Sequence, residues 1–447
     1  MRTEMTTVLT PEVVEYLITE SALRLADEET VRASVHQVKT HSNYPTAWEP
    51  NSLAMGLLGN ATLFLTLHGS GIGTSHDWKN LADELLESCA EEIVKCESNP
   101  DSLFGGLGGA LLTYVLATVN DPKWRRVAKM TAENFADQML TLDPLPDEGN
   151  ISDSDYDIIN GRAGALVSIS IASQQFPESN VIRAAQNQVF DDIYELLCRG
   201  KTLADTTWIH PLYYPHEDYI KEFPSGYFNM GVAHGLPGLL IALTSANVAG
   251  RRATQRLQLI TGLAKILLDS ALKDGFGLTW PSGYSRDRWP PETTSLPALG
   301  TPNAWCYGAP GVAVALSRAG QSLGDKRLIQ CARVAMQSAL NRTIATGSLE
   351  SISPTFCHGL SGILACSISV LGLPLPRNNS SNQHKIAACI LSKADEDYPL
   401  IFQDLEEPDQ HLDNPTVIQG AAGIALTLTL FQGKHHTPGW QNLFGLK

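Results

Sequence analysis

The segment Gly359-Leu360-Ser361-Gly362, followed by the apolar run Ile363-Leu364-Ala365, decides the fold because its pattern recurs along the whole chain. Each copy has two glycines separated by two residues, and mostly apolar or small residues follow. The first glycines of the seven copies are Gly56, Gly106, Gly161, Gly235, Gly308, Gly359 and Gly420. A motif that returns at such intervals is typical of a repeat architecture, in which each repeat is one supersecondary unit.

The residues between the copies predict two helices in each repeat. The run after each Gly-x-x-Gly motif is nearly all apolar, as expected of a helix that is buried on every side. The segments 78–86, 181–197 and 254–272 instead place apolar residues at helical spacing with charges opposite, which is typical of a half-exposed helix. These pairs predict an all-α fold, a seven-fold double-layered α/α toroid. The glycines would let the inner helices approach closely near the axis.

We expect one toroid domain over residues 1–447, with repeats from about 50 to 432 and two rim insertions. The insertions, at about 198–229 and 275–303, are rich in Pro, Gly and aromatic residues and lie in the two longest intervals. Short strands or hairpins are predicted near Trp208-Ile209 and at Leu278-Thr279-Trp280-Pro281. Loops of this length are more often functional than idle, although disorder is the alternative.

Composition and charge exclude several classes of protein. The 447 residues are 43% hydrophobic and 18% charged, and the formal net charge is −15. Such an acidic chain is not expected to bind nucleic acid or anionic lipid electrostatically. Its start lacks the apolar core of a signal peptide, and no run of about 18 apolar residues predicts a transmembrane helix. We therefore expect a cytoplasmic protein whose cysteines are reduced thiols.

Two cysteines and one histidine stand directly before Gly-x-x-Gly motifs. Cys306 lies in Trp305-Cys306-Tyr307-Gly308, and Cys357-His358 precedes Gly359. Two thiols and one imidazole are the ligand set of an open catalytic zinc site, whose fourth position stays free for water or a substrate thiol. A zinc ion there would hold a thiol as thiolate near neutral pH. A lone Cys-His pair is more often part of a core, but the two matched contexts favour metal binding.

Four elaborated repeats closely resemble one known family. Their segments are Tyr156-Asp157-Ile158-Ile159-Asn160-Gly161, Asn229-Met230-Gly231-Val232-Ala233-His234-Gly235, Trp305-Cys306-Tyr307-Gly308 and Cys357-His358-Gly359. Together with the seven Gly-x-x-Gly motifs, and in this order, they resemble the lanthionine synthetase C-like family, the LanC cyclases. The resemblance runs from the first repeat to the seventh. It implies the double-layered toroid with zinc at one end of its central cavity.

The resemblance also implies a role for each matching residue. The family's zinc ligands are matched by Cys306, Cys357 and His358. His234 matches the acid/base histidine, Asp157 the active-site aspartate, and Tyr307 the tyrosine beside the first zinc cysteine. Taken alone, His234 would be a core or capping histidine, Asp157 a helix N-cap and Tyr307 a packing residue.

One position departs from the family pattern. Many bacterial members resemble Arg-x-Ala-Trp-Cys at the first ligand, whereas this chain has Pro302-Asn303-Ala304-Trp305-Cys306. The departure puts the anion-stabilising part of the chemistry in doubt more than the zinc site. Either Arg286, Arg288 or Arg162 supplies the missing charge, or the reaction does without it.

The resemblance implies a zinc-dependent lanthipeptide (lantibiotic) cyclase. Such an enzyme forms lanthionine and methyllanthionine thioether rings by Michael-type addition of a peptide cysteine thiolate to dehydroalanine or dehydrobutyrine. His234 would protonate the enolate. Asp157 would orient that imidazole or take the thiol's proton, and Tyr307 would hydrogen-bond the enolate oxygen.

The implied partners are a dehydrated precursor peptide with its leader, a separate dehydratase, and an exporter complex that would bring the protein to the membrane. Three alternatives stay open. A related enzyme would add glutathione or another small thiol to dehydrated residues. A non-catalytic peptide-binding subunit is favoured by Pro302 alone. A prenyltransferase subunit would also be a zinc-based α/α toroid, but it leaves His234 unexplained.

Overall fold

Seven helices of the described chain form a closed inner ring, in which each helix packs on the next and the last packs on the first. The computed structural model describes residues 10–43, 48–95, 102–147, 151–203, 205–214, 216–289, 302–345, 349–374, 381–407, 410–433 and 440–447. In chain order the inner helices are α3 (Leu57–Ser70), α5 (Leu107–Asn120), α8 (Arg162–Gln175), α11 (Leu236–Ser245), α13 (Ala309–Leu323), α15 (Leu360–Leu371) and α17 (Ala421–Phe431).

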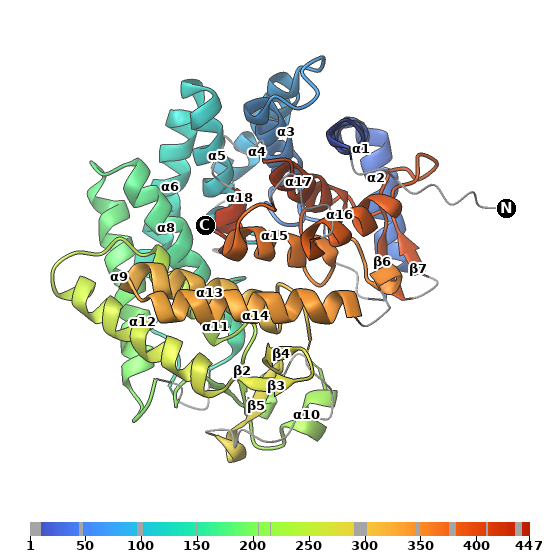
Figure 1. Cartoon of the computed structure of the whole chain (residues 1–447). Helices are drawn as coiled ribbons and strands as arrows, with labels where there is room; N and C mark the ends of the chain where they lie inside the picture. Colours follow the sequence, from blue (N-terminus) through green and yellow to red (C-terminus); the bar gives the residue numbers. More distant parts are fainter. Residues whose placement is uncertain are drawn as a thin grey trace.

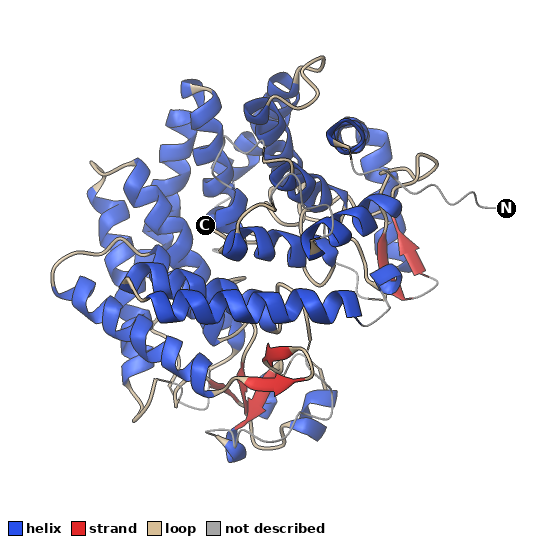
Figure 2. Ribbon diagram, in the orientation of Figure 1, coloured by secondary structure: helices blue, strands red, loops and turns tan. Residues whose placement is uncertain are grey.

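A second layer of helices covers this ring from outside (Figure 1). In the same order, the outer partners are α4 (Trp78–Lys95), α6 (Arg125–Thr141), α9 (Asn180–Cys198), α12 (Arg251–Asp269), α14 (Lys326–Ala345), α16 (Asn382–Ser392) and α1 (Pro11–Ala26). The predicted seven-fold double-layered α/α toroid is confirmed. Helices dominate the described chain, and its strands are short (Figure 2).

The outer helix of the seventh pair comes from the N-terminal end of the chain. Helix α1 packs against α17, and α2 (Glu28–His41) follows it on the outer surface. After α17 the described chain resumes at α18 (Trp440–Leu443), which lies inside the ring (Figure 1). The repeat motif could not reveal this pairing, because no Gly-x-x-Gly precedes residues 11–26.

The second glycine of every motif is required by a close backbone contact. A Cβ atom at these seven positions would lie 1.9 to 2.6 Å from the carbonyl oxygen of the residue six positions earlier. At Gly362, for example, it would lie 2.0 Å from the oxygen of Phe356. Any side chain would therefore push the helix start away from the loop that precedes it.

Backbone hydrogen bonds join the repeats at one equivalent position, two residues before the first glycine of each motif. We call these seven the junction residues: Ala54, Phe104, Ile159, Ala233, Cys306, Cys357 and Ile418. In six steps around the ring, the amide of one junction residue donates to the carbonyl of the next, over 2.9 to 3.4 Å. The last step returns from Ile418 to Ala54. Within the described residues, no such bond joins Ile159 to Ala233.

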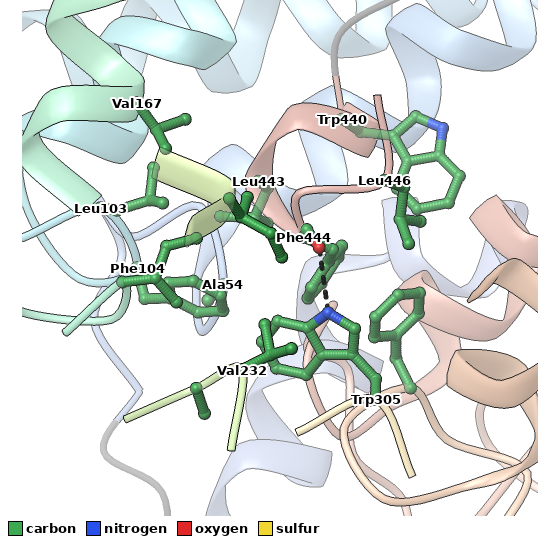
Figure 3. Close-up of a cluster of buried hydrophobic side chains, with 14 of the residues drawn as sticks. Ala54, Leu103, Phe104, Val167, Val232, Trp305, Trp440, Leu443, Phe444 and Leu446 are labelled. Carbon is green, nitrogen blue, oxygen red and sulfur yellow. Dashed lines mark hydrogen bonds between the residues drawn. The ribbon is translucent and has the colours of Figure 1, made fainter. Parts of the chain in front are cut away.

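The C-terminal segment fills the centre of the ring. Figure 3 shows Trp440, Leu443 and Phe444 among apolar side chains from several repeats. Trp305 donates its indole N–H to the carbonyl of Phe444 at 3.0 Å. The rings of Phe444 and Phe356 stack with their centroids 3.7 Å apart. Phe444 is fully buried, so this segment serves as a common core for loops that are distant in the sequence.

The two predicted insertions meet in one small sheet. Strand β2 (Tyr227–Asn229) pairs antiparallel with β1 (Trp208–Ile209) from the first insertion and with β5 (Gly283–Ser285) from the second. A hairpin of β3 (Leu272–Asp274) and β4 (Gly277–Thr279) lies against α14. The short strands predicted near Trp208 and Leu278 are confirmed. Residues 290–301 of the second insertion lie outside the described residues.

A further hairpin, β6 (Asp404–Glu407) with β7 (Gln410–Leu412), precedes the seventh repeat and was not predicted. Its strands are short and polar, so their pattern resembles a loop. In the part of the chain that the structure describes, no helix is both long and apolar enough to cross a membrane.

We expect Phe444→Ala to lower the free energy of unfolding by about 3–5 kcal/mol, because it empties the centre of the ring. Urea unfolding followed by circular dichroism measures this change. Leu212→Ala is the matched control, since Leu212 is 82% exposed and its removal should change little. A Phe444→Ala protein as stable as the control would contradict the assigned role of the C-terminal segment.

Candidate active site and metal centre

Cys306 and Cys357 meet because they are junction residues of adjacent repeats. The amide of Cys306 donates to the carbonyl of Cys357 at 3.3 Å, and the two side chains also hydrogen-bond. This thiol hydrogen bond lowers the pKa of Cys306, whereas the same bond and burial raise the pKa of Cys357. Cys306 is buried and Cys357 is half-buried, and their hydrogen bond makes Cys306 the thiol of the pair that is easier to deprotonate.

His358 follows Cys357 directly and is exposed to solvent. Its imidazole makes no hydrogen bond with the described chain. Among the described residues, no three His, Cys, Asp or Glu side chains converge as a formed metal cluster. The structure therefore brings together two of the three predicted ligands and leaves the third beside them.

The residues present fit a zinc ion by the chemistry of their donors. A pair of thiols in which Cys306 has a lowered pKa offers soft ligands, and an adjacent imidazole completes a catalytic zinc set. Cys306, Cys357 and His358 would hold the ion once the imidazole turns towards the sulfurs. The fit supports the predicted ligands without fixing their geometry.

His234 and the buried Asp157 form a hydrogen-bonded dyad beside the cysteines. The Nδ1 atom of His234 lies 2.5 Å from Oδ2 of Asp157. The Oδ1 atom of Asp157 accepts hydrogen bonds from the amides of Asn160 and Gly161 at 2.7 and 2.9 Å. Asp157 is fully buried, whereas the His234 side chain is 35% exposed. The second imidazole nitrogen is therefore left for a substrate.

Charge around His234 favours the imidazolium. Burial alone lowers the pKa of His234. The hydrogen bond that His234 donates to Asp157 and the charges of Asp157, Asp153 and Cys306 outweigh burial, so the net pKa is raised. A raised pKa increases the protonated fraction of the imidazole, which suits a general acid.

Asp153 is a second carboxylate at this site that the sequence analysis missed. It begins the single turn α7 (Asp153–Tyr156), and Asp157 ends this turn, with its amide donating to the carbonyl of Asp153 at 2.9 Å. Burial raises the pKa of Asp153, the charge of His234 lowers it, and Asp157 raises it again. The spacing of four residues between the two carboxylates was the available sequence signal.

Tyr307 is held by the loop that follows β2. Its hydroxyl accepts a hydrogen bond from Nδ2 of Asn229 at 3.2 Å, and Asn229 Oδ1 accepts from the amide of Gly231. A Cβ atom at Gly231 would lie 2.5 Å from the Tyr307 ring. Burial raises the pKa of Tyr307 well above its usual value, so the phenol keeps its proton.

The cations considered as replacements for the family arginine lie in different surroundings. Arg162 binds Asp192 on α9 at 3.2 Å and the carbonyl of Asp143 at 2.6 Å. Its guanidinium therefore joins the inner helix α8 to the outer helix α9. Arg286 stacks 3.7 Å above the ring of Trp208. Arg288 is exposed at the end of a 3-10 turn. The geometry makes Arg162 a structural residue and does not decide between the other two.

Comparisons with known proteins agree with this architecture. A model of the family described as lanthionine synthetase C-like protein matches residues 47–444. The nisin biosynthesis protein NisC of Lactococcus lactis subsp. lactis is 24% identical over 328 residues, which cover 71% of this chain and 73% of NisC. The solved structure of nisin cyclase superposes with a TM-score of 0.71 at 19% identity, covering 94% of this chain and 97% of that one.

We expect the pKa of His234 to lie above about 6.5 in the folded protein and to fall in Asp157→Asn. A raised folded pKa stabilises the fold at pH below about 6.5, and this contribution is lost as pH rises through the folded value. The difference in unfolding free energy between wild type and Asp157→Asn should therefore be larger at about pH 5.5 than at about pH 9. Denaturant unfolding at both pH values measures it, and equal differences would contradict the dyad.

Proposed function

The chain belongs to the lanthionine synthetase C-like family, and on this premise we propose that it is a zinc-dependent lanthipeptide cyclase. It would form (methyl)lanthionine thioether rings by adding a peptide cysteine to dehydroalanine or dehydrobutyrine. The observation that carries the proposal is the His234–Asp157 dyad beside the Cys306–Cys357 pair. A nucleophile site and a proton donor are the two parts that such an addition requires.

Cys306, Cys357 and His358 are the residues that would hold the metal. When bound there, zinc would supply the positive charge that favours the thiolate form of the substrate cysteine. The protein's own part is to bring the thiol near His234. The shared junction geometry supports this role, because Ala233, next to His234, donates its amide to the carbonyl of Cys306 at 3.4 Å.

The reaction forms one C–S bond and moves one proton. The sulfur lone pair attacks the β-carbon of the dehydrated residue, and the π electrons shift to give an enolate. The second nitrogen of His234 would pass a proton to the α-carbon and would take a proton from the next substrate thiol. Asp157 is saturated by His234 and two amides, which favours an orienting role over direct uptake of the thiol's proton.

Tyr307 is suited to stabilise the enolate oxygen. Its oxygen accepts from Asn229, so its own O–H remains available as a donor. Its raised pKa keeps that donor protonated at neutral pH. A preorganised donor of this kind acts where charge develops in the transition state. It would supply part of the stabilisation expected from the arginine that Pro302 replaces.

The similarity to NisC, a nisin biosynthesis protein, supports a peptide substrate. Because the reaction consumes dehydrated residues, a dehydratase must act on that peptide first. An exporter complex remains a further proposed partner, and association with it would bring the enzyme to the membrane. The same relative favours peptide cyclisation over addition of glutathione.

We expect His234→Ala to slow ring formation by about 10²- to 10⁴-fold while the bound zinc is retained. The assay follows loss of the free cysteine in a dehydrated peptide by thiol alkylation and mass spectrometry, with zinc measured in parallel. His384→Ala is the control, because it removes an imidazole from the outer helix α16, away from the candidate site. Unchanged ring formation in His234→Ala would remove this residue from the mechanism.

A further inference from the structure

A buried carboxylate outside the predicted site contacts the loop that carries Cys357 and His358. Asp404 begins β6, in the hairpin before the seventh repeat, and is 1% exposed. Its Oδ1 atom accepts hydrogen bonds from the hydroxyls of Ser353 at 2.7 Å and Thr355 at 3.5 Å. Both hydroxyls lie in the same short loop as the proposed zinc ligands. The carboxylate is therefore fixed to that loop from a different element of the fold.

Both hydroxyl hydrogen bonds of this carboxylate end on Oδ1 and neither ends on Oδ2. The backbone of Leu405 is a further hydrogen-bond partner of the carboxylate. No described Lys or Arg side chain forms an ion pair with Asp404. Burying a carboxylate without a cation is costly, so an acidic side chain at this position calls for a positive group nearby.

The candidate for that positive group is His358, because its charge acts on Asp404. Burial raises the pKa of Asp404, and the charge of His358 acts in the opposite direction. The charge of Asp404 also reaches the Cys357 thiol. Asp404 thus lies in electrostatic range of two proposed ligands at once. The His358 imidazole makes no hydrogen bond with the described residues.

A metal-ligating imidazole normally donates its other ring N–H to a carboxylate, carbonyl or water, which fixes the ring and makes it a better ligand. We propose that Asp404 is the positioning residue for His358, accepting its N–H when the other ring nitrogen binds zinc. The inference rests on the proposed function, since it requires zinc at this site.

The rival explanation is that Asp404 only ties two loops together through Ser353 and Thr355. Asp413 provides a matched control, because it is also a buried aspartate of this region, 4% exposed, and is bound by Gln403 at 3.2 Å. Asp404→Asn keeps an oxygen for Ser353 but offers an N–H₂ group in place of the second carboxylate oxygen. An amide donor facing the imidazole N–H cannot accept its hydrogen bond.

The test is the zinc affinity of the full chain, measured by competition with a chromophoric chelator. We expect Asp404→Asn to bind zinc about 10- to 100-fold more weakly than wild type, and Asp413→Asn to match wild type. Cobalt substituted for zinc should show altered ligand-field bands in Asp404→Asn only. Wild-type affinity and bands in Asp404→Asn would overturn the inference.

Two further variants keep the outcomes distinct. Ser353→Ala removes one anchor of the carboxylate and should give an affinity between wild type and Asp404→Asn. If Asp404→Asn does not fold, wild-type affinity in a folded Ser353→Ala would overturn the inference instead. Cys357→Ala lacks one proposed ligand and gives the zinc affinity of a chain without the complete site. A wild-type protein that binds zinc no better than Cys357→Ala would contradict the proposed zinc chemistry itself.

Discussion

The ring of backbone hydrogen bonds between junction residues is the constraint on which the site depends. Each bond joins the same position of two repeats. Five of the six bonds join residues 50 to 73 positions apart, and the sixth joins Ile418 to Ala54 across 364 positions. Cys306 and Cys357 occupy this position in the fifth and sixth repeats. Tyr307, His358 and His234 each occupy the next position in three consecutive repeats. The chemistry is therefore placed by symmetry: a side chain moved by one residue would lose its register with its neighbours.

Most of the fold could be predicted because it depends on sequence patterns that are local to each repeat. The seven Gly-x-x-Gly motifs mark the starts of the seven inner helices. Each second glycine is required by a close contact with a carbonyl oxygen of its own repeat. The pairing of α1 with α17 and the C-terminal segment at the centre could not be predicted, since both depend on contacts between distant parts of the chain. Phe444 and Trp305, for example, are joined by a hydrogen bond across 139 positions.

In the candidate site, too, the residues that stand in motifs could be predicted and the residues outside motifs could not. Cys306, Cys357, His234 and Asp157 stand in motifs, and the structure brings them together. Asp153 and Asp404 belong to no motif, and their importance comes from burial and from the charges around them. Arg162 shows the reverse case: it was one of three candidates for the charge of the missing arginine, but it binds Asp192 of the outer layer. Sequence motifs thus identify groups that touch a substrate better than groups that act through another residue.

X-ray absorption at the zinc edge tests the central claim most directly, because it reports which atoms surround the metal. For the zinc-loaded protein, the account predicts two sulfur ligands and one imidazole, with a third sulfur added when a dehydrated peptide containing cysteine is bound. A metal environment of oxygen and nitrogen alone would contradict the ligand set. A sulfur count unchanged by the peptide would contradict activation of its thiol at this site.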